Sequence, residues 1–277
     1  MQHLQWFPGH MTAAMRMMED NLKAVDGVIL ILDARAPRAS LNYKLEKLFA
    51  NKKVLYVLNK CDLIESFDAK RTAREFEKEG RRTIAISALD KRAINLLYDS
   101  IFDMLKEKVE KNKLKGVFKP MRIMVAGIPN TGKSTIINAL CGGKKAITGN
   151  KAGVTRGKQW VRIRELELLD TPGTMPPAFE NQAYAKHLAY IGSMNDANID
   201  FADLAFEFLK EMREKYPMLL KNKYGIENLE LDTIEIYNAI CVRRGFLRRG
   251  GEFDYDRLAI ALIDDFRKGR IGKIILD

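Results

Sequence analysis

The sequence predicts an α/β fold, in which helices cover both faces of a mostly parallel sheet, followed by a small all-helical domain. Short apolar, β-rich runs alternate with helix-patterned segments over the first two thirds of the chain, and after Pro176-Pro177 the strand signal stops. The length of 277 residues suits one large domain and a smaller one. We therefore expect domains at 1–178 and 179–277.

Each element follows from a local pattern. The expected strands are 27–32, 53–58, 83–87, 121–126 and 160–169, and the expected helices of the first domain are 11–24, 40–50, 68–80, 91–112 and 133–141. Residues 112–120 are basic and contain a glycine and a proline, so we expect them to connect two halves of that domain. The second domain is expected to hold helices at 180–192, 201–215, 231–241 and 254–268.

Composition excludes several classes of protein. Charged residues make up 30% and hydrophobic residues 47%, which is typical of a globular chain. No apolar run approaches the ~20 residues of a transmembrane helix, and the N-terminus lacks the layout of a signal peptide. The three cysteines are isolated, which argues against disulfides and a zinc site. We expect a cytoplasmic monomer that contacts no membrane.

The net charge of +11 is unevenly distributed. Residues 1–179 hold 32 Lys and Arg against 19 Asp and Glu, whereas residues 180–277 hold 15 against 17. The excess favours a polyanionic partner such as RNA. Charge alone leaves solubility as an equally good explanation.

A phosphate-binding loop is predicted at 127–134, where GIPNTGKS fits G-x-x-x-x-G-K-[ST] between a strand and a helix. Its glycines let backbone N–H groups face phosphate oxygens, Lys133 would reach the outer phosphates, and Ser134 would bind Mg²⁺. The residues expected around the phosphates are Asn130, Thr131, Gly132, Lys133, Ser134 and Thr135.

A second phosphate motif, Asp170-Thr171-Pro172-Gly173, follows a strand about 40 residues later. Asp170 would hold Mg²⁺ through water, and the Gly173 N–H would contact the γ-phosphate. Thr155 lies between the two motifs and is the expected second hydroxyl ligand of Mg²⁺; a surface-loop threonine is the alternative.

The base-reading motif is Asn59-Lys60-Cys61-Asp62, directly after a strand. The Asp62 carboxylate can accept from both N1–H and the 2-amino group of guanine, whereas adenine would leave it unpaired. Asn59 is expected to brace the loop and Lys60 to lie along the purine. Ser87-Ala88 would offer the Ala88 N–H to guanine O6. GTP and GDP are therefore the expected ligands.

These motifs stand in rotated order, with the base-reading motif before the phosphate loop. The set resembles the circularly permuted branch of the translation-factor-related GTPases. The segments WFPGHM at 6–11 and DARAP at 33–37 are similar to the N-terminal signature and D-A-R-x-P motif of the YlqF/RbgA family. The resemblance implies a three-layer P-loop GTPase domain of low intrinsic rate. It also implies a role in assembly of the large ribosomal subunit, with that subunit and its rRNA as partners.

Two further roles are implied by the resemblance. Ras-like enzymes orient water with a Gln after D-x-x-G, but Thr174 stands there. The family implies that His10 supplies the water-positioning group instead; a histidine that caps or packs a helix start is the alternative. Asn130 matches the asparagine that helps related GTPases bind K⁺, so K⁺ is an expected cofactor beside Mg²⁺.

The second domain offers one candidate RNA contact, the cluster Arg243, Arg244, Phe246, Arg248 and Arg249. Arginines suit phosphates and Phe246 would stack on a base; a solvated turn is the alternative. The rotated order puts both chain ends at the second switch, which is the segment after the Asp170–Gly173 motif. We therefore expect the nucleotide state to set the orientation of the helical domain toward RNA. The rival functions are a protein-directed signalling switch without RNA and a metabolic kinase-like enzyme, which the base-reading motif disfavours.

Overall fold

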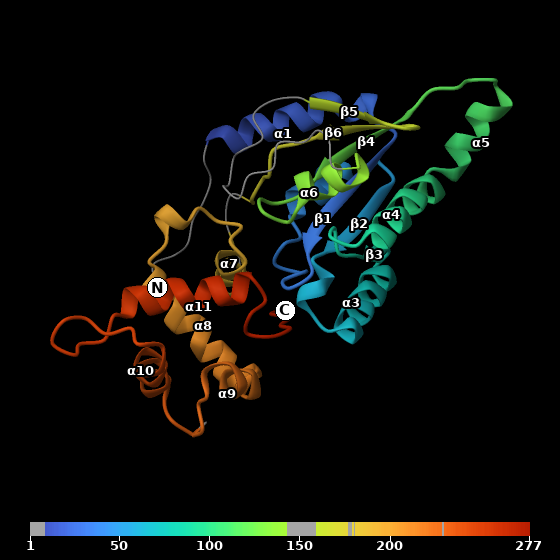
Figure 1. The fold of residues 1–277 in the computed structure, drawn as a ribbon. Helices are drawn as coiled ribbons and strands as arrows, with labels where there is room; N and C mark the ends of the chain where they lie inside the picture. Colours follow the sequence, from blue (N-terminus) through green and yellow to red (C-terminus); the bar gives the residue numbers. More distant parts are fainter. Residues whose placement is uncertain (1–8, 143–158, 177–178, 180, 229) are drawn as a thin grey trace.

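The computed structural model describes residues 9–142, 159–176, 179, 181–228 and 230–277. Within these ranges one six-stranded sheet has the order β3-β2-β1-β4-β6-β5. Its parallel strands are β1 (Gly27–Asp33), β2 (Val54–Asn59), β3 (Thr83–Ala85), β4 (Met121–Ala126) and β6 (Leu166–Asp170), and β5 (Gln159–Ile163) runs antiparallel to β6 (Figure 1).

Helices cover both faces of this sheet, which confirms the three-layer prediction. Successive strand side chains point to opposite faces. Ile29 and Ile31 pack with α4 (Lys91–Met104) and α6 (Lys133–Leu140). Val28 and Leu30 pack on the other face with α1 (Gly9–Asn21), α2 (Tyr43–Phe49) and α3 (Ser66–Lys78).

Two expected elements of the first domain are each split in two. The strand expected at 160–169 is the β5–β6 hairpin, which turns at Arg164 with φ of 49°. The helix expected at 91–112 ends at Met104, and α5 (Lys106–Leu114) follows as a separate helix. Leu105 between them is buried against the core, whereas α5 buries none of its residues. The connector therefore begins after Leu114, where α5 ends.

The second domain is helical as expected. It contains α7 (Gln182–Tyr190), α8 (Phe201–Lys215), α9 (Pro217–Tyr224), α10 (Thr233–Arg244) and α11 (Tyr255–Arg267), of which α9 was not predicted. Its centre is aromatic: the ring of Phe208 lies 5.1 Å from that of Tyr190 and 4.9 Å from that of Phe266. Helix α10 begins with a capping box formed by Asp232 and Glu235, which satisfies amides that no helical carbonyl reaches.

The helical domain and the GTPase domain share apolar core. Met11 of α1, Ala36 after β1, Ile128 after β4 and Met175 after β6 are buried in the same cluster as the helical-domain residues. The division of the chain at 178 and 179 therefore stays a prediction, because apolar packing crosses it. Among the described residues, no helix has the length and apolar character that a membrane crossing requires.

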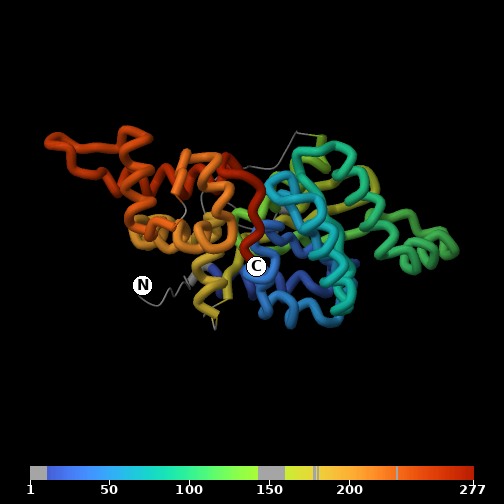
Figure 2. Tube along the Cα trace, turned by 90° about the horizontal axis from the view of Figure 1, so that it is seen from below, coloured from blue at the N-terminus to red at the C-terminus, as the bar shows by residue number. Residues whose placement is uncertain are grey.

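The last seven residues, 271–277, return to the GTPase domain and run between the two parts (Figure 2). The Leu276 N–H donates to the Arg35 carbonyl at 2.7 Å. The Asp277 side chain accepts from the N–H groups of Arg38 at 2.8 Å and Ala39 at 2.9 Å. The chain end thus fastens the helical domain to the loop after β1.

His187 of α7 lies between two carboxylates at this junction. Its Nε2 is 3.0 Å from Glu211 Oε1 and its Nδ1 is 3.4 Å from Asp277 Oδ2. Lys215 donates to the same Glu211 oxygen. Burial by itself lowers the pKa of His187, but the bonds to Asp277 and Glu211 outweigh it, so the pKa lies above its ordinary 6.5.

This geometry predicts that stability falls as pH rises above neutrality. Because the folded pKa of His187 is above the unfolded value, its contribution is fully present below about pH 6.5 and is lost as pH rises through the folded pKa. We expect His187→Gln to flatten the free energy of unfolding between pH 6 and 8, measured by urea denaturation at each pH. Asp277→Asn removes one charge that raises the folded pKa of His187, so it should narrow the pH range over which this stability is lost. Equal pH slopes in the wild type and His187→Gln would contradict the assignment.

Candidate nucleotide site

The predicted motifs meet at one edge of the sheet. The loops after β1, β2, β3, β4 and β6 follow parallel strands, so all of them leave the sheet at its carboxyl edge. Ligands of open α/β sheets bind outside this edge. The base-reading motif, Ser87-Ala88, the phosphate loop and Asp170–Gly173 are brought together there, whatever their order in the chain.

The phosphate loop is fixed by two glycines. Gly127 has φ of 147°, and a Cβ there would overlap the Ile31 carbonyl of β1. Gly132 has φ of 94°, and a Cβ there would overlap the Asn59 amide. Helix α6 starts directly after Gly132, so its N-terminal end adjoins the loop. This is the arrangement that binds phosphate.

The Lys133 side chain is buried and lies across the phosphate loop. Its Nζ donates to the Ile128 carbonyl at 2.7 Å across the loop. Burial lowers the pKa of Lys133 to about 8, and the charge of Asp170 only partly offsets this. An anion in the loop would therefore relieve the unfavourable burial of the ammonium group.

Asp170 and Gly173 lie against the phosphate loop. Asp170 is buried at the end of β6, in register with Val125 of β4. A Cβ on Gly173 would lie 2.7 Å from Pro129 N, so only glycine lets this backbone approach the loop. A hydroxyl from Ser134 and a carboxylate from Asp170 are hard oxygen donors, and this donor set fits Mg²⁺. Thr155 lies outside the described residues, and no group of three His, Cys, Asp or Glu that could hold a metal occurs within them.

Asn59 joins three loops. Its Nδ2 donates to the Thr131 carbonyl at 2.8 Å, and its Oδ1 accepts from the Ala88 N–H at 3.0 Å. The predicted bracing role of Asn59 therefore has a structural basis. The Ala88 N–H, which we expected to face guanine O6, is bound to Asn59. Asp62 is exposed at the start of the turn after β2.

Lys60 connects the base-reading loop with the phosphate loop. It has φ of 67°, and its Nζ donates to the Asn130 carbonyl at 2.6 Å and to Asp33 Oδ2 at 2.7 Å. Burial lowers the pKa of Lys60, although Asp33 pulls it the other way. The lysine that we expected along the purine is thus also a link to β1.

Asp33 and Arg35 form a fully buried ion pair after β1. Arg35 Nε lies 2.9 Å from Asp33 Oδ1, and Arg35 Nη2 lies 2.8 Å from Oδ2. Burial would raise the pKa of Asp33, but Arg35 and Lys60 outweigh it and hold that pKa far below its ordinary value. Arg35 Nη1 donates to the Arg267 carbonyl of α11 at 3.2 Å, and the guanidinium lies 5.1 Å from the centre of the Phe266 ring.

A second connection runs from the phosphate loop to the same helix. Asn130 Nδ2 donates to the Gly192 carbonyl, and Ser193 Oγ donates to the Pro129 carbonyl at 2.8 Å. The Arg267 guanidinium donates to the carbonyls of residues 189 and 190 at 2.8 and 3.0 Å, at the end of α7. Lys60, Asp33, Arg35, Arg267, the turn 189–192 and Asn130 thus form a closed circuit of contacts, which we call the interdomain ring.

Known proteins with this arrangement are GTPases. The family model "50S ribosome-binding GTPase" matches residues 122–236. Ribosome biogenesis GTPase A of Bacillus pumilus is 38% identical over 99% of this chain and 98% of its own length. That of Bacillus licheniformis is 39% identical over 98% of this chain and 96% of its own length. The chain belongs to the ribosome biogenesis GTPase A family.

Solved members of this family have the same fold. The crystal structure of GNP-bound YlqF from T. maritima superposes with a TM-score of 0.66, at 26% identity, over 96% of this chain and 97% of its own. The GDP-bound form gives the same TM-score over 95% and 98%. The expected P-loop GTPase domain with permuted motifs is therefore confirmed.

The structure places only the backbone of His10, in the first turn of α1. The neighbouring Met11 is buried, and its sulfur accepts from the Met175 N–H at 3.5 Å. The start of α1 therefore lies beside the segment that follows Gly173, as the permuted order predicts. The catalytic role of His10 in this GTPase stays a prediction.

The arginine cluster of the helical domain differs from its predicted role in one respect. Phe246 is only 8% exposed and belongs to the apolar core, so the prediction that it stacks on a base is wrong. The guanidinium groups of Arg244 and Arg257 cover its ring at 5.8 and 4.8 Å. Arg244 pairs with Asp265 at 3.3 Å and Arg248 with Asp256 at 2.8 Å. The four arginines of the cluster remain exposed.

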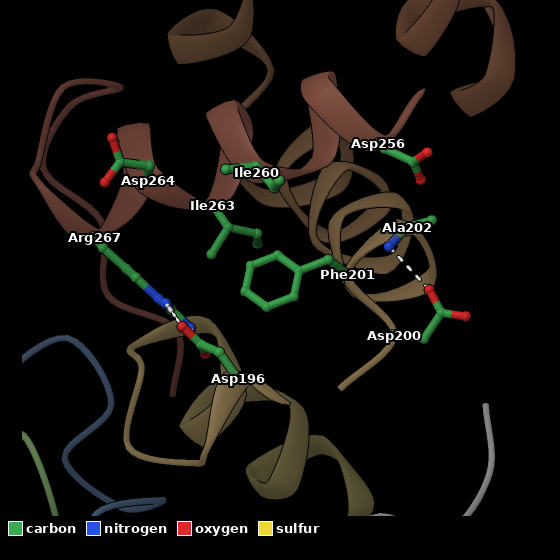
Figure 3. A pocket seen from close by; sticks show the side chains of 9 residues that line it. All are labelled: Asp196, Asp200, Phe201, Ala202, Asp256, Ile260, Ile263, Asp264 and Arg267. Atoms are coloured by element: carbon green, nitrogen blue, oxygen red, sulfur yellow. Dashed lines mark hydrogen bonds and ion pairs between the residues drawn. The ribbon is translucent and has the colours of Figure 1, made fainter. Parts of the chain in front are cut away.

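A separate hollow of about 500 Å³ lies between α8 and α11 (Figure 3). It adjoins the helical-domain side of the interdomain ring through Arg267, and its lining combines acidic side chains with the apolar Ile260 and Ile263. Asp196 is bound by Arg267, and Asp200 caps α8 by accepting from the Ala202 N–H at 3.0 Å. These two carboxylates therefore already have structural partners in the helical domain.

Sequence reasoning missed the members of the ring that lie outside the nucleotide motifs. Arg35 was part of a recognised motif but had no assigned role, and Gly192, Ser193 and Arg267 carried no local signal. Their contacts join residues 62 to 232 positions apart, which no short-range pattern can reveal.

The buried ion pair predicts a large effect of one substitution. Arg35→Ala leaves Asp33 buried with only Lys60 as a charged partner, so we expect a loss of roughly 3–5 kcal/mol in the free energy of unfolding. Arg82→Ala breaks an exposed pair with Asp103 and should cost no more than about 1 kcal/mol. Urea denaturation of both variants measures this, and similar losses would contradict the importance of the buried pair.

Proposed function

We propose that this protein hydrolyses GTP during assembly of the large (50S) ribosomal subunit, and that its nucleotide state controls contact of the helical domain with rRNA. The interdomain ring is the observation that carries the proposal, because it attaches both nucleotide loops to the helical domain. The names of the relatives and of the family model support the ribosomal partner. We further propose that it acts in the cytoplasm.

The guanine end of the site would be read by Asp62, with Asn59 holding the loop and Lys60 beside the purine. The Ala88 N–H would be shared between Asn59 and guanine O6. The phosphates would lie in the loop formed by residues 130–135, with Lys133 neutralising their charge. Ser134, Asp170 and Thr155 would hold Mg²⁺, which supplies charge stabilisation for phosphoryl transfer when bound.

Hydrolysis needs a group that orients water, since Thr174 cannot replace the glutamine of Ras-like enzymes. We assign this role to His10, and the contact of the neighbouring Met11 with Met175 after Gly173 supports the assignment. Asn130 uses its amide nitrogen to hold Gly192, so its oxygen is the atom that would face K⁺. Equal hydrolysis rates in KCl and NaCl would contradict a K⁺ site.

Coupling follows from the two functions of the ring residues. Lys60 and Asn130 belong to the loops that hold nucleotide, and through Asp33, Arg35 and Gly192 they also hold the helical domain. A nucleotide that shifts either loop therefore binds the protein with a different free energy when the helical domain is docked than when it is released. The coupling is reciprocal, so the ribosomal partner must change nucleotide affinity.

The affinity of the protein for purified large-subunit particles tests this coupling. We expect GDP and a non-hydrolysable GTP analogue to give affinities that differ roughly 5- to 150-fold, corresponding to about 1–3 kcal/mol. Particles should also stimulate hydrolysis. Identical affinities in both nucleotide states would overturn the coupling, and absent particle binding would overturn the ribosomal function.

Asp62→Asn tests the base-reading assignment. The amide presents a donor where guanine also presents donors, so GTP affinity should fall and preference should move toward xanthosine triphosphate. Competition binding of the two nucleotides measures this preference. Asp99→Asn, an exposed change on α4, is the matched control and should leave GTP preference intact.

A further inference from the structure

The segment 111–119, which we call the basic tip, combines exposed charged and exposed apolar side chains at one end of the GTPase domain. It holds four lysines, at 111, 113, 115 and 119, and no acidic residue. Leu114 is 90% exposed and Phe118 is 91% exposed, with Val117 between them at 40%. Single exposed apolar side chains are ordinary, but three among four cations form an amphipathic patch that suits a binding surface.

The tip projects because its base is anchored and its end is not. At the base of α5, Lys108 pairs with Asp26, and Glu107 pairs with Lys53 at 2.7 Å. Among the described residues, the four tip lysines have no ion-pair partner. Figures 1 and 2 both show α5 and the following turn extending beyond the sheet, away from the helical domain. The charge and the phenyl ring are therefore presented together to solvent.

We propose that the basic tip binds RNA, with its lysines on backbone phosphates and Phe118 stacked on an unpaired base. The inference rests on the proposed ribosomal function, which supplies an RNA partner. Unpaired bases stack readily on aromatic rings, and clustered cations track the backbone of a single strand. Phe118 offers the ring that Phe246, buried in the helical domain, does not.

The pattern of α5 favours RNA over a lipid surface. A helix that lies on a membrane carries a continuous apolar stripe along its length. In α5 only Val109 and Leu114 are apolar, and the rest of KEKVEKNKL is charged or polar. One phenyl ring among lysines at the end of a polar helix matches stacking on a base better than insertion into acyl chains.

The tip lies at the opposite edge of the sheet from the nucleotide. It leads into the first residue of β4, Met121, whose N–H donates to the Glu165 carbonyl in the β5–β6 turn. The nucleotide loops follow the other ends of β4 and β6. Contact at the tip should therefore strengthen RNA binding to the same degree in both nucleotide states.

Binding of the full-length protein to a 20-nucleotide mixed-sequence single-stranded RNA, to a duplex of equal length and to large-subunit particles tests the proposal. Phe118→Ala should weaken single-strand binding about tenfold and duplex binding little, because stacking needs an unpaired base. Lys113→Ala with Lys115→Ala should reduce the slope of log affinity against log salt by about 1.4, from roughly 0.7 per lost phosphate contact. Particle affinity should fall by the same factor with GDP and with a GTP analogue, and basal GTP hydrolysis should not change.

Helix α3 supplies matched controls. Phe67 is 70% exposed there, and Lys70 and Lys78 are exposed on the same helix. Phe67→Ala and the pair Lys70→Ala with Lys78→Ala should leave RNA affinity intact. Equal effects of tip and control variants, or loss of binding to anionic lipid vesicles with RNA binding intact, would overturn the proposal. If the wild type fails to bind particles, the proposed function fails, and the RNA oligomers still decide the role of the tip.

Discussion

The ion pair between Asp33 and Arg35 is the interaction on which the arrangement of the site depends. Both side chains are almost fully buried, so each charge is tolerated only because the other is present. The planar guanidinium of Arg35 uses one edge for Asp33 and another nitrogen for the Arg267 carbonyl. A lysine, with a single charged nitrogen, lacks this fixed fork. The pair therefore holds the loop after β1 in contact with Lys60 through Asp33 and with α11 through Arg35.

The permuted chain order allows the helical domain to be attached to the nucleotide edge of the sheet at both of its ends. One end of the helical domain is connected to the segment after Gly173, where Met175 packs on Met11. Its other end, the chain terminus, binds the loop after β1 through Leu276 and Asp277. The helical domain is thus held at both ends on the nucleotide edge of the sheet. Our expectation from chain order alone placed the connection only at the second switch, whereas the structure adds the phosphate and base-reading loops.

Features that depend on neighbouring residues could be predicted from the sequence, whereas contacts between distant segments could not. The glycines, lysine and aspartates of the nucleotide motifs act within a few residues of a strand end, so spacing was enough to find them. Helix α5 and the β5–β6 hairpin were missed because a periodic pattern does not show where a chain turns or leaves the core. Phe246 was misjudged because its neighbouring arginines suggested a surface, while the packing of α10 and α11 buries the ring. The ring contacts of Arg35 and Arg267 depend on the docking of two domains and have no signature in either segment.

If the basic tip and the helical domain both bind RNA as proposed, the separation of the tip from the nucleotide edge gives the two surfaces different thermodynamic roles. A contact that is the same in both nucleotide states raises affinity without changing the ratio between states, since only differential interaction shifts an equilibrium. It would also make the second contact intramolecular, so that the helical domain would encounter the same RNA at a high effective concentration. The interdomain ring then needs to supply only the difference of about 1–3 kcal/mol that is typical of coupling between sites. Under the proposed function, a change of this size could release the protein only if the remaining contacts were of moderate strength, because a uniformly tight binder would stay bound in both nucleotide states.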